Sequence, residues 1–160
     1  MSATTKWAIV RTNVQIPRPP VIGDRGAADE LRSVVISESL IGAATARPKG
    51  LFGAQWLWLA GWARPWLARR ATAPLPATPI YVAVTSNELR LFSKSLGLPP
   101  YEIGRWRNYR ASLTESRGTL KLELQLERLG RVTLIRGPFI GKPARAVFNL
   151  VVQHAAGPVS

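Results

Sequence analysis

The chain has 160 residues, of which 22 are Lys or Arg and 9 are Asp or Glu, giving a formal net charge of +13. A chain of this length can bury the core of one domain without disulfide or metal support. It has no cysteine and 1 histidine, which excludes a thiol nucleophile and disfavours a zinc site, and we expect no cofactor. The excess of arginine predicts an anionic partner or surface.

Residues 1–23 are predicted to form an extended N-terminal arm that ends in the proline-rich run Ile16–Pro20. Arg11 interrupts the only apolar run of this arm, which is too short for a secretory signal. From Asp24 onward, apolar residues at helical spacing predict a helix with Asp24 as its N-cap. The run Leu40–Ala46 then predicts a strand, and residues 24–157 are expected to form one domain.

The segment 51–70 interrupts this domain with four of the chain's tryptophans, which are Trp56, Trp58, Trp62 and Trp66. Its uncharged part ends at Arg64, so it is shorter than the roughly 20 residues that a membrane-spanning helix needs. A proline-rich linker, residues 71–79, follows it.

Two interpretations of the Trp-rich segment stay open. Tryptophan prefers the headgroup region of a bilayer, and Lys49, Arg69 and Arg70 flank the segment with no acidic residue between positions 41 and 79. The four tryptophans with Arg69 and Arg70 are therefore expected to contact a membrane interface. In the alternative interpretation, the segment is a helical insertion that packs on the domain or forms a homo-oligomer interface through residues 51–67.

The C-terminal half alternates between apolar and polar residues. In Thr119–Glu127, every second residue is leucine, which is typical of a strand with one buried face. The predicted strands are Ile80–Thr85, Leu89–Lys94, Tyr101–Arg107, Tyr109–Leu113, Thr119–Glu127 and Arg131–Arg136. A bulge at Gly104 is expected, because it would let both Ile103 and Trp106 face the core.

The apolar residues of positions 144–152 recur at helical spacing, which predicts one C-terminal helix. The expected fold is α+β: a small antiparallel partial barrel closed by this helix, with an N-terminal helix and the Trp-rich helical insertion. Its predicted core contains Leu120, Leu122, Leu124, Val132, Leu134, Val147, Phe148 and Val151.

The run Ile80–Phe92, the sequence Glu102–Trp106, the leucine-rich hairpin and the helix Ala144–Val152 together resemble the bacterial pleckstrin-homology-like domains. The resemblance covers the C-terminal half of the chain. It implies a partial barrel in which a helix plugs one end, and a role in binding lipid, peptide or protein. It carries over no functional residue, because the shared motifs are structural.

Arginine and aromatic residues alternate where Arg105, Arg107 and Arg110 bracket Trp106 and Tyr109. Such interleaving is typical of surfaces that bind lipid headgroups or nucleic acid. We expect neighbouring strands to add Arg90 and Lys121 to this anionic-surface site. The alternative is a solvated sheet face, because any half-exposed sheet directs its charges outward.

These features predict a binding or scaffold module rather than an enzyme. Its expected partner is an anionic membrane surface or a protein, and its expected location is the cytoplasm, at the inner face of the membrane. The second hypothesis is a nucleic-acid-binding protein that uses the same arginines on phosphates. The single histidine, His154, is expected to be a cation near a helix C-terminus.

Overall fold

The computed structural model describes residues 20–35, 39–50, 72–95, 97–137 and 142–159. The elements are β1 (Ile22–Gly23), α2 (Arg25–Val34), β2 (Leu40–Pro48), β3 (Ile80–Thr85), β4 (Leu89–Ser93), β5 (Tyr101–Trp106), β6 (Arg110–Ser116), β7 (Thr119–Leu126), β8 (Gly130–Arg136) and α5 (Lys142–His154). The predictions for residues 1–19 and for the Trp-rich segment lie outside the described residues.

The eight described strands form one sheet, in which the main path runs β5-β4-β3-β2-β8-β7-β6. Neighbours along this path are antiparallel, and β1 pairs with β2 in parallel. Strands β5 and β6 end the path and do not pair with each other, so the sheet is not closed. The predicted α+β fold with an antiparallel sheet and a C-terminal helix is therefore confirmed.

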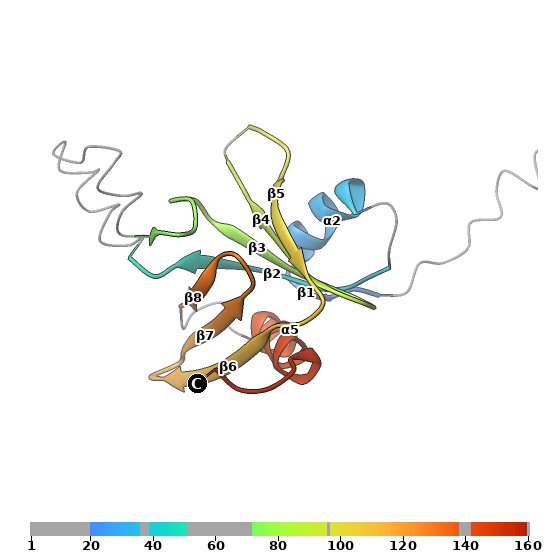
Figure 1. Ribbon diagram of the computed structural model, residues 1–160. Helices are drawn as coiled ribbons and strands as arrows, with labels where there is room; N and C mark the ends of the chain where they lie inside the picture. The colour runs from blue at the N-terminus through green and yellow to red at the C-terminus, as the bar shows by residue number, and fades with distance from the viewer. Residues whose placement is uncertain (1–19, 36–38, 51–71, 96, 138–141, 160) are drawn as a thin grey trace, which may run out of the picture.

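Two helices cover different faces of the sheet, as Figure 1 shows. Helix α2 places Ala27, Ala28 and Leu31 against the outer face of β2–β4, where they meet Tyr81 and Phe92. Helix α5 packs against β1, β2 and β6 and fills the concave side of the sheet. Because α2 covers one face of β2–β4 and the main core covers the other, both faces of these strands are apolar. Their sequences are therefore largely continuous apolar runs rather than alternating ones.

The core that the sequence predicted is the core of the structure. The main cluster includes Leu120, Leu122, Leu124, Val132, Leu134, Val147, Phe148 and Val151. Each of these eight side chains is at most 2% exposed. The alternation in β7 and the helical spacing in α5 thus correctly identified the buried face of each element.

Strand β5 contains the bulge that the sequence predicted. Gly104 pairs with Leu91 and Glu102 with Phe92, so Ile103 is the extra residue opposite the β4 ladder. Trp106 is buried, whereas Ile103 is only partly buried. A Cβ on Gly104 would lie 2.8 Å from a ring carbon of Trp106, which explains why glycine occupies this position.

Asp24 precedes α2 as predicted, but its side chain does not cap the helix, which corrects that part of the prediction. Its carboxylate instead accepts a hydrogen bond of 2.8 Å from the Thr45 backbone N–H. Arg136 forms an ion pair with Asp24 at 3.2 Å and donates to the Thr45 carbonyl oxygen at 2.6 Å. The Asp24 and Arg136 side chains thus provide hydrogen-bond partners for the Thr45 backbone, which lies on the edge of β2 between its pairing with β1 and its pairing with β8.

The short strand β1 was not predicted, because the sequence assigned residues 22–23 to the N-terminal arm. Gly23 has φ +114°, and a Cβ there would lie 2.0 Å from the Ala43 carbonyl oxygen. Only glycine allows the chain to approach β2 this closely in that conformation. The strand brings Asp24 to Thr45 and starts α2 at the outer face of the sheet.

Candidate anionic-ligand interface

The arginines that the sequence grouped on one face are divided between different surfaces. Arg90 and Arg105 are cross-strand neighbours on β4 and β5, on the outer face next to α2. Arg90 is 3% exposed and lies 5.3 Å from the centre of the Phe92 ring. It does not lie on the protein surface, so its predicted contact with an anionic surface has no support from its position.

One carboxylate, that of Glu102, joins these two arginines. Arg90 donates to it at 2.9 and 3.3 Å, and Arg105 donates at 2.8 and 2.9 Å. The hydrogen bonds from Arg105 and Arg90 lower the pKa of Glu102, although its partial burial opposes the shift. This three-residue network carries a net positive charge. Within it, Arg105 faces solvent and Arg90 is buried.

Arg107 and Arg110 lie near each other along the chain, and Lys121 is separated from both. Arg107 is exposed in the connection from β5 to β6, and Arg110 is exposed at the start of β6. Lys121 lies opposite Thr114, four residues further along β6 than Arg110, which is roughly 13 Å along the strand. It also forms an ion pair of 3.0 Å with Glu123 and is therefore separate from the other two residues.

The structure adds two arginines, Arg128 and Arg131, to those that the sequence predicted for the anionic-surface site. Gln125 of β7 pairs with Arg110 on one side and with Arg131 of β8 on the other, so the two arginines flank it on one face. Arg128 is exposed in the turn between β7 and β8. We use the name arginine cluster for Arg105, Arg107, Arg110, Arg128 and Arg131. Only knowledge of the register could have found Arg131.

The two aromatic residues between these arginines point away from the surface. The Trp106 indole N–H donates to the Glu127 carbonyl oxygen at 2.9 Å, and the residue is 8% exposed. The Tyr109 hydroxyl donates to the Val151 carbonyl oxygen at 2.8 Å, and burial raises the pKa of Tyr109 to about 12. Neither ring is available to stack on a base, because both belong to the core.

A groove of about 610 Å³ lies beside the arginine cluster, between β5 and the turn from β7 to β8. Its walls are formed by Glu102, Ile103, Gly104, Arg105, Trp106, Glu127, Arg128 and Leu129. Five of these residues are consecutive along β5, so the groove follows the edge of the open sheet.

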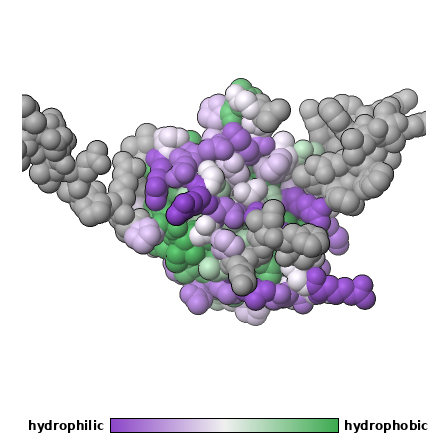
Figure 2. Space-filling model, turned by 180° about the vertical axis from the view of Figure 1, so that it is seen from behind, coloured by the Kyte–Doolittle hydropathy of each residue, from purple (hydrophilic) through white to green (hydrophobic). Residues whose placement is uncertain are grey.

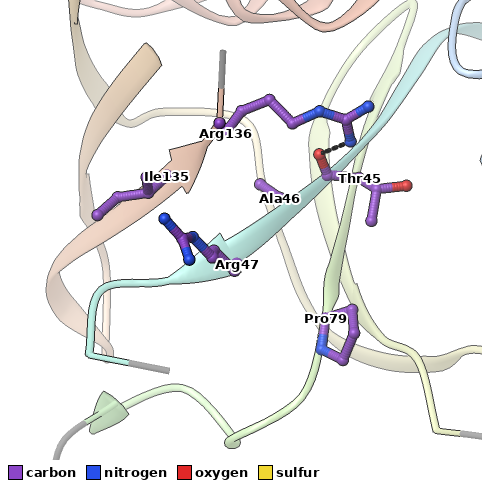
Figure 3. Close-up of a pocket in the computed structure, with 7 residues that line it drawn as sticks. Thr45, Ala46, Arg47, Pro79, Ile135 and Arg136 are labelled. Atoms are coloured by element: carbon purple, nitrogen blue, oxygen red, sulfur yellow. Dashed lines mark hydrogen bonds between the residues drawn. The ribbon is translucent and has the colours of Figure 1, made fainter. Parts of the chain in front are cut away.

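A second cavity, of about 300 Å³, lies where β2 passes from β3 to β8 (Figure 3). Thr45, Ala46, Pro79 and Ile135 give it a largely apolar wall, beside Arg47 and Arg136. Figure 3 shows the Arg136 side chain reaching across to the Thr45 carbonyl oxygen. Since Arg136 is bound in this way, its role here is to hold β2 and β8 together.

Apolar side chains are exposed in the connection between β4 and β5. Leu98 is 61% exposed and Tyr101 is 75% exposed. The projection at the top of Figure 1 is this connection, and apolar side chains appear at its tip in Figure 2. We use the name apolar loop for residues 94–101, of which residue 96 lies outside the described part.

The apolar loop is held to the domain by polar contacts at its base. The Lys94 ammonium group donates to the Leu98 carbonyl oxygen and forms an ion pair with Glu30 of α2, both at 2.8 Å. The Lys94 backbone N–H donates to the Pro79 carbonyl oxygen at 3.0 Å. Pro79 is the last residue of the proline-rich linker, so the described part of this linker, residues 72–79, joins the sheet at the base of the apolar loop.

The described residues contain no group of three His, Asp or Glu side chains that could bind a metal ion. His154 is exposed in the last turn of α5, at the helix end where the sequence placed it. In the described part of the chain, no helix has the length and apolar character needed to cross a bilayer. Trp56, Trp58, Trp62, Trp66, Arg69 and Arg70 lie outside the described residues.

Comparisons with known proteins supply no relative from which a role could be transferred: no protein-family model, curated protein or solved structure matches the chain. The candidate sites are therefore defined by their geometry and charge.

Proposed function

We propose that this protein is a non-catalytic binding module of the pleckstrin-homology-like type that associates peripherally with an anionic membrane surface. The path of four strands followed by three, with α5 packed across the concave side, supports this fold type. Binding occurs at the end of the sheet that carries the apolar loop and the linker residue Pro79.

The observation that carries the proposal is the exposure of Leu98 and Tyr101 on a loop that is fixed at its base. A leucine that enters the interface from water is stabilised by loss of its contact with water, and tyrosine favours the headgroup level. The Lys94–Glu30 ion pair and the hydrogen bond to Pro79 hold the loop in place before binding. This end of the protein then loses little conformational entropy on contact with a membrane.

Charge supports the same orientation. Lys49 is exposed at the end of β2, and Arg64, Arg69 and Arg70 follow it in a stretch without acidic residues from position 42 to position 79. Basic residues next to an apolar anchor are attracted to anionic lipids by about 1 kcal/mol each near the surface. Apolar insertion and charge attraction therefore act together, as peripheral attachment normally requires.

Co-sedimentation of the full chain with vesicles tests the proposal, using phosphatidylcholine with and without phosphatidylserine. Replacing Leu98 and Tyr101 by serine should weaken binding to the anionic vesicles by about tenfold, since two partly inserted side chains are lost. The melting temperature should not change, because both side chains are exposed. The control is Ile22→Ser, which removes another exposed apolar side chain, on β1. Equal binding by all three proteins would disprove membrane attachment through this loop.

Nucleic-acid binding is the second candidate function, and the exposed Arg107, Arg110 and Arg128 favour it. These side chains could contact phosphates, but Trp106 and Tyr109 are buried and cannot stack on bases. Nucleic-acid binding would therefore be electrostatic and largely independent of sequence. A gel-shift assay with single-stranded and duplex oligonucleotides distinguishes this function, because the variant Leu98→Ser/Tyr101→Ser should leave it unchanged.

A further inference from the structure

The arginine cluster has more positive charge than the neighbouring acids can balance. Glu102 is the ion-pair partner of Arg105, but it is also the partner of the buried Arg90. Among the residues that the structure describes, Arg107, Arg110 and Arg128 have no carboxylate within ion-pair distance. Like charges held close together repel one another, so an anionic partner would be bound favourably here.

The groove next to the cluster has the shape of a site for an extended chain. Five consecutive residues of β5 form one wall, which corresponds to a length of roughly 16 Å. The opposite wall is the turn that contains Glu127 and Arg128, and the Trp106–Glu127 hydrogen bond holds the two walls together. Since β5 has only β4 as a strand neighbour in the described sheet, it borders the groove as an edge strand.

We propose that this groove and the arginine cluster form a docking site for an extended acidic segment of a partner protein. Carboxylates of the segment pair with Arg107, Arg110 and Arg128 at the rim of the groove. Its backbone lies along β5, where an edge strand offers hydrogen-bonding groups to an added chain. The bulge at Ile103 and Gly104 interrupts regular pairing, so the charged rim provides most of the attraction.

The walls of the groove favour a peptide over a nucleic acid. Glu127 presents an exposed carboxylate to the groove, whereas the Glu102 carboxylate already accepts hydrogen bonds from Arg90 and Arg105. A peptide can donate a backbone N–H group to the Glu127 carboxylate while its own acidic side chains reach the arginines, and a phosphodiester backbone has no N–H group to donate. The two nearby aromatic rings are buried, which removes the stacking that single-stranded nucleic acids use.

This site is separate from the membrane contact proposed above and does not depend on it. The groove begins at Glu102, next to Tyr101, but Arg107 follows the other end of β5 and is roughly 20 Å from Tyr101 along the strand. A flat membrane that contacts Leu98 and Tyr101 leaves the cluster in solution. The protein could then hold an acidic partner near a membrane.

The experiment measures the binding of the full chain to a fluorescein-labelled peptide of alternating glutamate and serine, by fluorescence anisotropy. The variant Arg107→Gln/Arg110→Gln/Arg128→Asn should bind about tenfold more weakly, because each exposed charge pair contributes a few-fold or less. Asparagine replaces Arg128 because this residue has φ 75°. The matched control, Arg25→Gln/Arg145→Gln/Arg117→Asn, removes the same charge at exposed positions and also changes one residue of positive φ.

The control variant should bind the peptide within about twofold of the unchanged protein, since its residues lie outside the groove. Equal weakening of both variants would overturn the proposal by showing a general charge effect. So would equal binding of a peptide with glutamine in place of glutamate, or tighter binding of a single-stranded oligothymidylate of matched length. Vesicle binding distinguishes the two sites: it should fall for Leu98→Ser/Tyr101→Ser and stay unchanged for the cluster variant. Loss of vesicle binding in the cluster variant would place these arginines on the membrane and reject a separate site.

Discussion

At the scale of single residues, the position of a charged side chain decides what it can do, and Arg90 is the clearest example. It is the cross-strand neighbour of Arg105, yet its side chain is buried and contacts Phe92 and Glu102. A buried charge without a partner is strongly destabilising, so the carboxylate of Glu102 is needed for the fold. The arginines that remain for binding are those on connections and strand ends.

Replacing Glu102 by glutamine should destabilise the protein by about 3 kcal/mol at neutral pH, because the buried Arg90 would lose the one carboxylate with which it pairs among the described residues. Urea denaturation gives this value directly. The control is Glu127→Gln, an exposed carboxylate that forms no ion pair with the described residues, which should change stability by less than about 0.5 kcal/mol. Similar stability of both variants would show that Glu102 does not compensate the charge of Arg90.

The pH dependence of the unfolding free energy should differ between the Glu102→Gln variant and the unchanged protein. Because the pKa of Glu102 is lower in the folded state than its ordinary value of 4.5, the ionised form favours folding. Its contribution is complete above pH 4.5 and is lost as the pH falls below this value toward the folded-state pKa. The Glu102→Gln protein should therefore lose less stability on acidification than the unchanged protein. Parallel stability curves would contradict this assignment.

At the scale of secondary-structure elements, α5 closes the concave side of a sheet whose end strands do not pair. Ala144, Val147, Phe148 and Val151 are all fully buried and all belong to the main core cluster. The helix compensates for the missing pairing between β5 and β6 by covering apolar surface that a closed barrel would bury itself. Its contribution to stability should therefore be large for its length.

Replacing Phe148 by alanine should cost about 3–5 kcal/mol of folding free energy, since the side chain is 0% exposed and leaves a cavity. Thermal or urea unfolding measures the loss. The neighbouring change Asn149→Ala, at an exposed position of the same helix, is the control and should be nearly neutral. A small effect of Phe148→Ala would mean that α5 is not an integral part of the core in solution.

At the scale of the whole molecule, the chain separates apolar and basic surface along β5. The apolar loop and Pro79, the end of the proline-rich linker, are near the start of this strand, and the arginine cluster is near its end. The sequence predicted the arginine site and the membrane contact of the Trp-rich segment as separate features, but it did not predict the exposed apolar loop. The separation along β5 makes the functions of the apolar loop and the arginine cluster independently testable.

Replacing Trp58 and Trp62 by serine tests the two interpretations of the Trp-rich segment. If the segment contacts the membrane, vesicle binding should fall by about tenfold or more while the melting temperature changes little. If it packs on the domain or between subunits, the melting temperature should fall and vesicle binding should not. We expect the first result, because basic residues border the segment without an intervening acid. A loss of stability alone would decide for packing.

Local patterns in the sequence determined the elements and the core. Alternating leucines identify β7, helical spacing identifies α5, and the conflict in parity between Ile103 and Trp106 correctly predicted the bulge in β5. These properties depend on neighbours in the chain, since side-chain direction follows from the period of the element. That is why the predicted core residues are buried together.

Which charged residues share a surface was decided only by the tertiary structure. Arg110 and Arg131 are 21 positions apart in sequence and flank Gln125 because of the pairing of β6, β7 and β8. The sequence grouped Arg90 and Lys121 with Arg110, but Arg90 is buried and Lys121 lies at a distance from Arg110 along β6. The capping role predicted for Asp24 likewise failed because β1 directs its carboxylate to Thr45. Such contacts depend on strand register and on the order of strands in the sheet, which local periodicity does not specify.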